Sequence, residues 1–391
     1  MSSTCRSSAP AWEIFCRVVD NFGDIGVCWR LARDLAGRTG AGVRLWVDDW
    51  AVLARICPPV AAIDPGRGGI VAGVELRHWA APFPLVEPAG VVIEAFACDI
   101  PAEHLHTMAR RQPAPVWINL EYLSAEDWVS GCHAMASPHP RLPLVKHFFF
   151  PGFDDGSGGL LRERGLLERR TAFHHDRAGR ADWFASKGVA PEEGALCVSL
   201  FAYGQPDLPG LLRSWAEGPQ RMHVFVPEGK VMADVERALG PIRLSAGGSV
   251  RMGELGVHVL PFTDQDGYDA LLWACDLNFV RGEDSFVRAQ WAGVPFVWQI
   301  YAQQDDAHFD KLDAFMASYA SGLAEREADA LARFWRAWNG RGKLADAWPA
   351  FAAALPVLRR HAAGWCDALA AQPDLVTRLT RFCSHIKALP G

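Results

Sequence analysis

Short apolar runs alternate with amphipathic helical segments along most of this 391-residue chain. In the first part, apolar runs of strand length occupy residues 14–19, 43–47, 74–79, 91–96 and 116–120. Between the first two runs, apolar residues recur at helical spacing, from Ile25 through Cys28, Trp29 and Ala32 to Leu35. Parallel strands need a long connection, usually a helix, between them. The pattern therefore predicts a parallel sheet with crossover helices.

The same alternation returns after a change of composition at about residues 151–188. That stretch holds a Gly-Ser-Gly-Gly run followed by many arginines, which is typical of a connection between domains. Further strand-like runs occupy residues 196–201, 222–226, 257–260, 277–280 and 296–300. From about residue 306 the pattern is almost wholly helical. We predict an α/β protein of two successive halves with a helical C-terminal tail.

Composition excludes several classes of protein. Half of the residues are hydrophobic, which is enough for a packed core. No run reaches the roughly 18–20 uncharged apolar residues of a membrane span, and the N-terminus lacks the apolar core of a secretory signal. A net charge of −6 argues against nucleic acid as a partner. Neither the cysteines nor the histidines are spaced as metal ligands. We expect a reduced cytoplasmic protein without membrane attachment and without a metal.

The first informative segment is CRVVDNFGDIG, residues 16–26, which carries Asp20 and Asp24 where the first strand ends. Ligands usually bind at this edge of an open α/β sheet. The segment has neither the glycine spacing of a dinucleotide fingerprint nor the lysine of a phosphate-binding loop. Two carboxylates suit proton abstraction or recognition of a cation. The alternative is that both aspartates serve only the turn and the helix cap, where Asp24 is expected.

The second segment is LNFVRGEDSFVRAQ, residues 277–290, in which a strand is followed by Arg281, Glu283, Asp284 and Ser285 and then by a helical pattern. Backbone N–H groups at a helix N-terminus bind phosphate, and an arginine adds a bidentate positive group. We therefore predict an anion site, most simply for a diphosphate. The alternative is a capped helix with a surface ion pair.

Polar and aromatic residues after other strands form two further sets. In the second half, Phe201, Tyr203, Phe262 and Gln265 would suit a pyrimidine base, although each aromatic taken singly is more often a core residue. In the first half, residues at the strand ends could line an acceptor site, with packing as the alternative for the tryptophans: Trp46, Asp48, Asp49, Trp50, Glu94, Glu121 and Tyr122.

Three stretches together resemble a known family. CRVVDNFGDIGVCWRLARDLA, INLEYLSAEDWV and LNFVRGEDSFVRAQWAGVPFVWQIYAQ are similar to the bacterial elongation factor P maturation arginine rhamnosyltransferases, from about residue 12 to the helical C-terminus. The resemblance implies a GT-B fold, with two Rossmann-like domains facing across a cleft and a helical C-terminal tail. The expected boundaries are 1–180 for the acceptor-side domain, 181–358 for the donor-side domain, and 359–391 for helices that pack back on the first domain.

The resemblance also implies an activity. The expected enzyme is an inverting, metal-independent glycosyltransferase that moves L-rhamnose from dTDP-β-L-rhamnose to an arginine of elongation factor P, which activates that factor for ribosomes stalled at polyproline. Asp20, Asp24 and Glu283 match its catalytic carboxylates. The residues that match its donor site are Phe201, Tyr203, Phe262, Gln265, Arg281, Asp284 and Ser285. No cofactor is expected.

The implied chemistry accounts for the carboxylates. A guanidinium is protonated at neutral pH and has no free lone pair to attack a sugar. Asp20 as a general base would remove a proton, while Asp24 or Glu283 would orient the group. Two alternatives remain open at this point. One is a GT-B transferase with another nucleotide sugar and a small or lipid acceptor, and the other is a nucleotide-sugar-binding module without catalysis.

Overall fold

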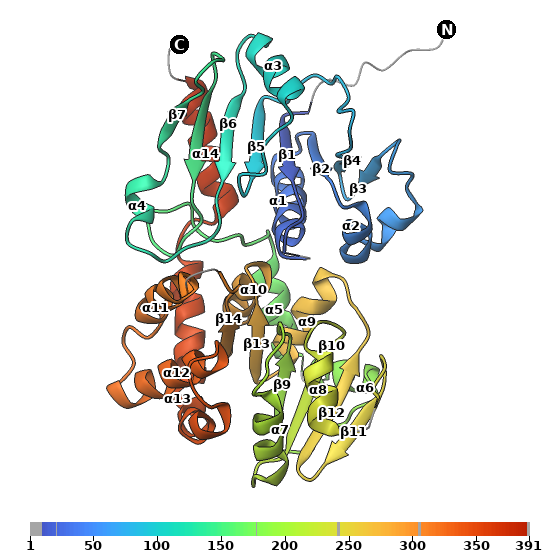
Figure 1. The fold of residues 1–391 in the computed structure, drawn as a ribbon, viewed down its shortest axis with the longest axis vertical. Helices are drawn as coiled ribbons and strands as arrows, with labels where there is room; N and C mark the ends of the chain where they lie inside the picture. The colour runs from blue at the N-terminus through green and yellow to red at the C-terminus, as the bar shows by residue number, and fades with distance from the viewer. Residues whose placement is uncertain (1–9, 21, 177, 241–242, 304–305, 389–391) are drawn as a thin grey trace. The chain divides into compact units, whose positions relative to one another are not determined.

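The computed structural model describes residues 10–20, 22–176, 178–240, 243–303 and 306–388. The chain forms two compact units, residues 1–164 with 372–391 and residues 165–371. Within the described residues, the first unit contains a sheet of eight strands and the second a sheet of six (Figure 1). The predicted class, two α/β halves with a helical C-terminal region, is confirmed.

The sheet of the first unit is parallel except at its two edges. Its strand order is β3-β4-β2-β1-β5-β6-β8-β7, and only the β3–β4 and β7–β8 pairs are antiparallel. The strands are β1 (Trp12–Cys16), β2 (Val43–Val47), β3 (Gly69–Val71), β4 (Val74–His78), β5 (Val91–Ala95), β6 (Val116–Leu120), β7 (Ala136–Pro138) and β8 (Val145–Phe149). Because β1 lies between β2 and β5, the segment that follows it leaves the middle of the sheet.

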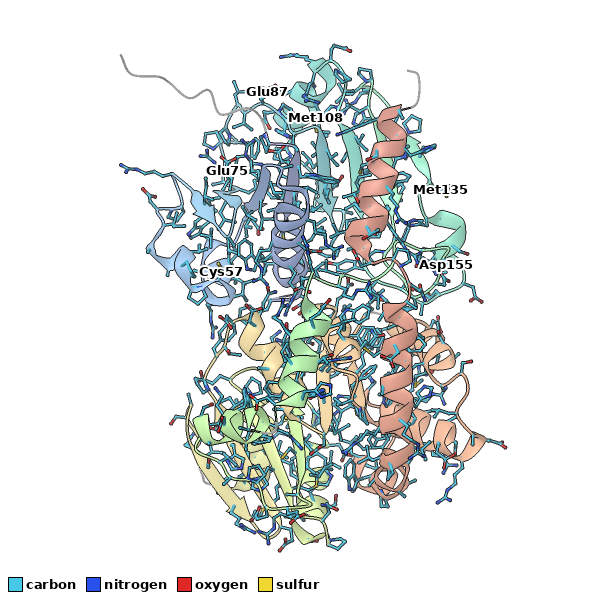
Figure 2. The ribbon with its side chains drawn as sticks, turned by 180° about the vertical axis from the view of Figure 1, so that it is seen from behind. Cys57, Glu75, Glu87, Met108, Met135 and Asp155 are labelled. Carbon is cyan, nitrogen blue, oxygen red and sulfur yellow. The ribbon has the colours of Figure 1, made fainter. Side chains whose placement is uncertain are left out.

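Helices cover both faces of this sheet. The elements are α1 (Gly23–Thr39), α2 (Trp50–Ile56), the 3₁₀ helix η1 (Pro58–Ala62), α3 (Ala102–Arg110), α4 (Val129–Cys132) and α14 (Leu375–Ala388). Figure 2 shows α1 and α14 side by side over one face, and the two helices are in contact. The helix α1 ends at Gly40, which adopts the left-handed conformation and donates its N–H to Ala36.

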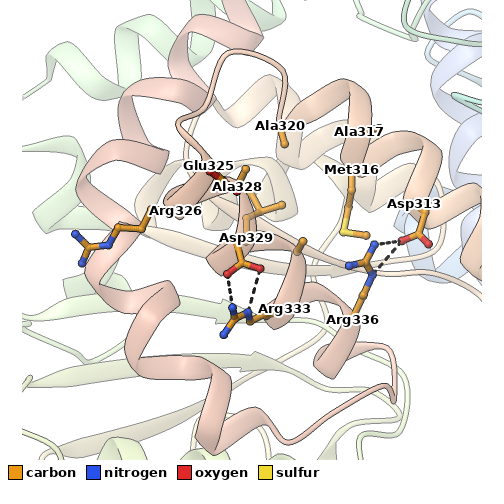
Figure 3. Close-up of a pocket in the computed structure, with 12 residues that line it drawn as sticks. Asp313, Met316, Ala317, Ala320, Glu325, Arg326, Ala328, Asp329, Arg333 and Arg336 are labelled. Carbon is orange, nitrogen blue, oxygen red and sulfur yellow. Dashed lines mark hydrogen bonds and ion pairs between the residues drawn. The ribbon is translucent and has the colours of Figure 1, made fainter.

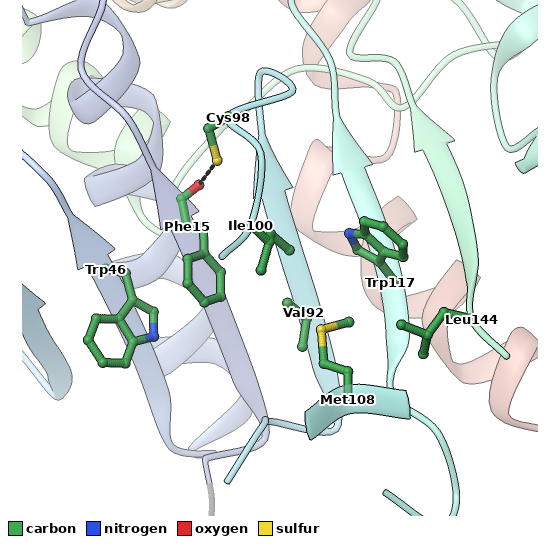
Figure 4. Close-up of a cluster of buried hydrophobic side chains, with 8 residues drawn as sticks. All are labelled: Phe15, Trp46, Val92, Cys98, Ile100, Met108, Trp117 and Leu144. Atoms are coloured by element: carbon green, nitrogen blue, oxygen red, sulfur yellow. Dashed lines mark hydrogen bonds between the residues drawn. The ribbon is translucent and has the colours of Figure 1, made fainter. Parts of the chain in front are cut away.

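The opposite face of the first sheet carries the apolar cluster drawn in Figure 4. Its members are Phe15, Trp46, Val92, Cys98, Ile100, Met108, Trp117 and Leu144. The buried Glu13 carboxylate lies nearby and accepts hydrogen bonds from Trp46 Nε1 (2.6 Å), His104 Nε2 (2.9 Å) and Arg44 Nη1 (3.2 Å). Burial raises the pKa of Glu13, but these partners outweigh it and hold that pKa below its usual value. Trp46 and Glu94, each 1% exposed, are therefore core residues.

The sheet of the second unit has the order β11-β12-β10-β9-β13-β14, and only β11–β12 is antiparallel. Its strands are β9 (Leu196–Leu200), β10 (Met222–Pro227), β11 (Ser249–Met252), β12 (Leu255–Leu260), β13 (Leu277–Arg281) and β14 (Phe296–Gln299). The strand β9 pairs with β10 on one side and β13 on the other. The carboxyl ends of β9, β13 and β14 therefore lie at one edge, where the predicted donor residues follow.

The helices of the second unit are α5 (Leu166–His175), α6 (Gly179–Ser186), α7 (Leu208–Glu217), α8 (Met232–Leu239), α9 (Gln265–Ala274), α10 (Asp284–Ala292), α11 (His308–Tyr319), α12 (Glu325–Trp338) and α13 (Leu344–Ala370). The helix α5 packs on α6 and α9, so residues 165–180 belong to this unit and not to the first domain. The helix α13 runs without a break through residue 358 and packs on α7, α10 and α12. Residues 359–371 therefore also belong to the second unit, and the chain returns to the first unit only at residue 372.

Candidate functional site

Asp20 lies in the loop that joins β1 to α1, and carboxylates hold this loop by its backbone. Val18 donates its N–H to Asp48 Oδ1 at 2.9 Å, while Val19 and Asp20 donate theirs to Asp24 Oδ2 at 2.7 and 2.8 Å. Hydrogen bonds to an ionised acceptor are about twice as strong as neutral ones. Hydrogen bonds to carboxylates thus fix the backbone N–H groups of three successive residues, Val18, Val19 and Asp20.

Asp24 holds this loop from within α1. It lies in the first turn of the helix and reaches back toward β1, whereas the capping position is Phe22, which makes no side-chain cap bond. The expectation that Asp24 caps the helix is therefore wrong. Its other oxygen, Oδ1, accepts the Tyr122 hydroxyl at 3.2 Å, and only 2% of Asp24 is exposed. Burial raises the pKa of the Asp24 carboxyl, although the N–H groups of Asp20 and Val19 oppose this effect.

Gly23 keeps room for the Asp20 carboxylate. A Cβ added at Gly23 would lie 3.0 Å from Asp20 Oδ2, which is too close without a shift of that side chain. Gly23 also donates its N–H to the Asp20 carbonyl at 2.7 Å and so closes the turn. The structure thus brings Asp20, Gly23 and Asp24 together in one tight segment at the carboxyl end of β1.

In the second unit, Arg281 is the last residue of β13 and lies between two aromatic rings. Its guanidinium carbon is 4.5 Å from the Phe201 ring centroid and 4.4 Å from that of Tyr203, and Arg281 is 6% exposed. Such contacts hold a cation and stack its planar group. The Lys230 ammonium lies 5.6 Å from the Tyr203 ring centroid. Three of the predicted donor residues therefore form one cationic and aromatic cluster.

Ser285 uses its hydroxyl on the backbone of Arg281. The hydroxyl donates to the Arg281 carbonyl and accepts the Arg281 N–H at 3.0 Å, so it closes the turn between β13 and α10. Glu283 and Asp284 lie at the start of α10, half-buried, at the capping position and the first helical position. The first turn of a helix directs its backbone N–H groups out of the helix, as an anion site requires.

Two residues that sequence reasoning did not assign support this cluster. Gln299, at the end of β14, accepts the Tyr203 N–H at 2.7 Å and donates to the Gly204 carbonyl at 3.2 Å. Trp298 donates its indole N–H to the Gly282 carbonyl at 2.7 Å, where Gly282 has a left-handed φ of 62°. The only sequence signal for either is their place at the carboxyl end of a strand beside β13.

Phe262 lies in the loop before α9, and Gln265 is the first residue of that helix. Asp264 caps α9 by accepting the Gly267 N–H at 2.9 Å. Gln265 is buried and Phe262 half-buried. The ring of Tyr268, one turn into α9, lies edge-on to the Phe201 ring, with centroids 5.4 Å apart. The structure thereby links α9 to the Arg281 cluster through Phe201, with Phe262 and Gln265 at the beginning of that helix.

A buried ion pair joins α9 to α10. Arg288 donates from Nε to Asp269 Oδ1 at 2.8 Å and from Nη2 to Asp269 Oδ2 at 2.6 Å, and both side chains are 2% exposed. This bidentate geometry fixes both the distance and the relative orientation of the two helices. Both helices begin with predicted donor residues, Gln265 on α9 and Ser285 on α10.

Other features of the described residues do not coincide with these clusters. Among those residues, no group of three or more His, Cys, Asp or Glu side chains is placed to hold a metal ion, and no helix is long and apolar enough to cross a membrane. A pocket of about 780 Å³ lies between α11 and α12 (Figure 3). Its rim carries the Asp329–Arg333 and Asp313–Arg336 ion pairs. None of its lining residues is a predicted site residue.

Comparison with known proteins gives one consistent result. The family model described as "Elongation-Factor P (EF-P) rhamnosyltransferase EarP" matches residues 12–384. A protein-arginine rhamnosyltransferase of Pseudomonas aeruginosa is 50% identical over 375 residues, covering 95% of this chain and 98% of the relative. One of Neisseria meningitidis is 34% identical over 383 residues, covering 95% and 96%.

A solved structure agrees with the sequence comparison. It is described as the structural basis for EarP-mediated arginine glycosylation of translation elongation factor EF-P. Its TM-score is 0.68 at 36% identity, with 97% of this chain and 100% of that chain covered. The two α/β units are thus those of a GT-B glycosyltransferase, and the chain belongs to the EarP family of EF-P rhamnosyltransferases.

Proposed function

We propose that this protein transfers L-rhamnose from dTDP-β-L-rhamnose to the side chain of one arginine of elongation factor P, with inversion at the anomeric carbon. The rhamnosyl group and the arginine acceptor follow from the names of its relatives. The nucleotide and the stereochemistry are proposed from the family resemblance, and the two clusters are compatible with them. Because the acceptor is a translation factor, we place the reaction in the cytoplasm.

The single observation that carries the proposal is the fixed position of Asp20. A guanidinium must lose a proton as one of its nitrogens attacks the anomeric carbon, since all its nitrogen lone pairs are delocalised. In our scheme a new C–N bond forms, the bond from the anomeric carbon to the diphosphate oxygen breaks, and the proton passes to the Asp20 carboxylate. The backbone bonds from Asp20 and Val19 to Asp24 hold the segment of backbone that carries that carboxylate.

The second unit supplies the group that receives the leaving diphosphate. Arg281 is held between Phe201 and Tyr203 directly before α10, so its charge and the helix N-terminus are adjacent in the chain. Positive groups placed before the reaction stabilise the charge that develops on a leaving oxygen. Glu283 and Asp284 flank this position, and we assign Glu283 to the sugar or the guanidinium because its carboxylate would repel a diphosphate.

The proposed reaction needs no metal and no cofactor. Arg281 and the first turn of α10 take the part that a divalent cation plays in other nucleotide-sugar enzymes. Aromatic rings of the donor cluster, Phe201 and Tyr203, are available to the thymine base, with Phe262 and Gln265 as further candidates. This division leaves the first unit free for the acceptor.

The test is an intact-mass measurement. The protein is incubated with elongation factor P and dTDP-β-L-rhamnose, with and without excess EDTA. We expect the acceptor to gain the mass of one deoxyhexose at the same rate in both samples, and nuclear magnetic resonance of the product to show an α-linkage. An acceptor in which the modified arginine is replaced by lysine is the control, and it should gain nothing.

Each outcome has a separate meaning. No mass gain together with tight binding of dTDP would leave a nucleotide-binding module and overturn the proposal. A gain that EDTA abolishes and magnesium restores would overturn the metal-free mechanism. A β-linked product would overturn inversion. A gain with UDP-glucose equal to that with dTDP-β-L-rhamnose would remove the assigned donor.

A further inference from the structure

The helix α12 ends at an asparagine that is bonded to the strand β14. Asn339 follows the last residue of α12, and its Nδ2 donates to the Trp335 carbonyl within the helix at 2.9 Å and to the Trp298 carbonyl on β14 at 2.8 Å. Its Oδ1 accepts the N–H of Ile300, the residue directly after β14, at 3.0 Å. One amide side chain thus fixes the backbone on both sides of Gln299, the last residue of β14.

The end of β14 in turn carries two side chains that hold the backbone of the donor cluster. Gln299 accepts the Tyr203 N–H at 2.7 Å and donates to the Gly204 carbonyl at 3.2 Å. The Trp298 indole donates to the carbonyl of Gly282, directly after β13, at 2.7 Å. A displacement of the end of β14 would therefore move two segments of the donor cluster at once.

The end of α12 is itself firmly anchored. The ring centroid of Trp335 lies 5.4 Å from that of Phe296 on β14. The ring centroid of Trp338 lies 4.5 Å from that of Phe279 on β13, and both tryptophans are fully buried. The last carbonyls of a helix lack partners within the helix, and that of Trp338 accepts the side-chain amide of Gln205 at 2.6 Å. The helix is thus joined to both strands and to the loop after β9.

We propose that Asn339 is a positioning residue for the donor site, which fixes the end of β14 and, through it, the backbone of the donor cluster. This inference rests on the proposed function and concerns its donor site. Binding groups keep their productive geometry only when packing and hydrogen bonds behind them hold them there. Asparagine suits this place because its amide donates twice and accepts at the same time, whereas a carboxylate can only accept.

The test measures the dissociation constant of dTDP by titration calorimetry, for the full-length protein and its variants. Asn339→Ala removes all three side-chain hydrogen bonds and should raise that constant about 3- to 10-fold, the equivalent of one neutral hydrogen bond. Asn339→Asp keeps an acceptor for the Ile300 N–H but donates to neither carbonyl, so the constant should rise at least about threefold. The donor KM should rise with it, whereas the acceptor KM at saturating donor should not change.

A double variant shows whether Asn339 acts through β14. If it does, Gln299→Ala already removes part of what Asn339 secures. The double variant Asn339→Ala with Gln299→Ala should then bind dTDP at least about twofold more tightly than the product of the two single effects predicts. Effects that simply multiply would overturn the route through β14.

Asn278 on β13 provides a matched control. It is buried, its Oδ1 accepts the Ser199 hydroxyl at 2.6 Å, and its Nδ2 donates to the Leu272 carbonyl at 3.0 Å. Neither bond involves the end of β14 or the segments that it holds. Asn278→Ala should therefore lower the melting temperature at least as much as Asn339→Ala, but leave the dissociation constant of dTDP unchanged.

The outcomes separate this inference from the proposed function. A parent that binds dTDP but does not modify elongation factor P overturns the proposed function, and a parent that does not bind dTDP overturns both. If the parent is active and both Asn339 variants bind dTDP as it does, only the positioning role is overturned. Equal increases in Asn278→Ala and Asn339→Ala would indicate a general loosening and also overturn it, as would an acceptor KM that rises with the donor KM. Should Asn339→Ala not fold, Asn339→Asp, which keeps the shape of the side chain, decides.

Discussion

The Asp24 carboxylate accepts the backbone N–H of Asp20 at 2.8 Å, so the two aspartates of the β1–α1 segment do different work. The Asp24 carboxylate is buried and accepts hydrogen bonds from the N–H groups of Val19 and Asp20 and from the Tyr122 hydroxyl. Asp20, in contrast, is half-buried. A group that is already bonded on both oxygens suits a positioning role. We therefore propose that Asp20 is the catalytic base and that Asp24 acts on the reaction through the backbone that carries Asp20.

The first prediction separates these two roles by substitution. Asp20→Asn keeps the size of the side chain but cannot accept a proton, so turnover should fall by roughly 10²–10⁴ with little change in melting temperature. Asp24→Ala removes an acceptor of two backbone N–H groups and should lower the free energy of unfolding by about 2–3 kcal/mol as well as turnover. Kinetics and urea denaturation of both variants provide the check.

Asp24→Asn is the control for this pair. Its amide oxygen can still accept the two N–H groups, so we expect it to retain more stability and more turnover than Asp24→Ala. If Asp24→Asn is stable but as inactive as Asp20→Asn, the charge of Asp24 itself takes part in the reaction, and the positioning role is wrong.

The second prediction concerns Arg281 between Phe201 and Tyr203. Arg281→Ala should weaken dTDP binding by about 1.5–3 kcal/mol, the range for hydrogen bonds to charged groups. Arg281→Lys keeps the charge but loses the planar guanidinium that contacts both rings, so its affinity should lie between those of the parent and the alanine variant. Titration calorimetry with dTDP measures both.

Lys230 offers a comparison, because its ammonium also approaches the Tyr203 ring but its side chain is not held between two rings. Lys230→Ala should weaken dTDP binding less than Arg281→Ala. Unchanged affinity in Arg281→Ala would remove Arg281 from the phosphate site, and equal losses in both variants would show that only net charge matters there.

Much of the fold can be predicted from the sequence because parallel strands are buried on both faces and appear as continuous apolar runs. The ten predicted runs correspond to β1, β2, β4, β5, β6, β9, β10, β12, β13 and β14. The strand β8 has no such run, since Lys146 and His147 lie within it and Val145 is exposed. The edge strands β3, β7 and β11 are short and only partly buried, so they leave no apolar run to recognise.

The residue at which the second unit ends is difficult to predict from the sequence for a different reason. The helix α13 contains Pro349 and Pro356, and a proline within a helical pattern usually marks an end. Here the helix continues through both because its buried residues, among them Phe351 and Leu358, pack on neighbouring helices. The family resemblance implies a boundary at residue 358, whereas the chain leaves the unit only after residue 371.

The candidate site shows the same division between local and distant information. Spacing alone indicates that Asp20 and Arg281 follow strands, which suffices to nominate them. It does not reveal that the Ser285 hydroxyl bonds to the Arg281 backbone, or that Gln299, on β14, bonds to Tyr203 on the far side of β13. Those contacts depend on which strands are neighbours, and the strand order is a property of the folded sheet.

The third prediction concerns the buried pair Asp269–Arg288. Replacing a buried ion pair with apolar residues of similar volume is often neutral or stabilising, whereas removing one partner typically costs about 3–5 kcal/mol. Arg288→Met combined with Asp269→Leu should therefore melt near the parent temperature. If the pair is kept to align α9 with α10, dTDP binding should weaken at least about tenfold in this stable double variant.

Arg288→Met alone is the companion measurement, and it should be strongly destabilised by the unpaired Asp269. A double variant with parental stability and parental dTDP affinity would show that the ion pair has no positioning role. A double variant that melts far below the parent would show instead that the pair contributes mainly to stability.

The last prediction concerns His258 on β12, which is surrounded by His223, Ser249 and the ring of Phe225. Its Nε2 lies 2.9 Å from His223 Nδ1, and His223 in turn contacts the Glu192 carboxylate at 2.7 Å. Burial, and then the charge of His223, lower the pKa of His258 from 6.5 to about 4. Between these two values the unfolded chain binds the proton more readily than the folded protein, so acidification favours unfolding. The contribution of neutral His258 to the free energy of unfolding is complete above pH 6.5 and is lost as pH falls toward 4.

The variant His258→Gln cannot titrate, so the free energy of unfolding of the parent relative to this variant should fall by about 1–2 kcal/mol across that interval, after allowance for partial exposure. Urea denaturation of both proteins from pH 7.5 to 4.5 measures this difference in the free energy of unfolding. The contributions of the carboxylates and the other histidines are common to both proteins and cancel. A difference that stays constant with pH would mean that His258 takes up its proton as easily in the folded protein as in the unfolded chain.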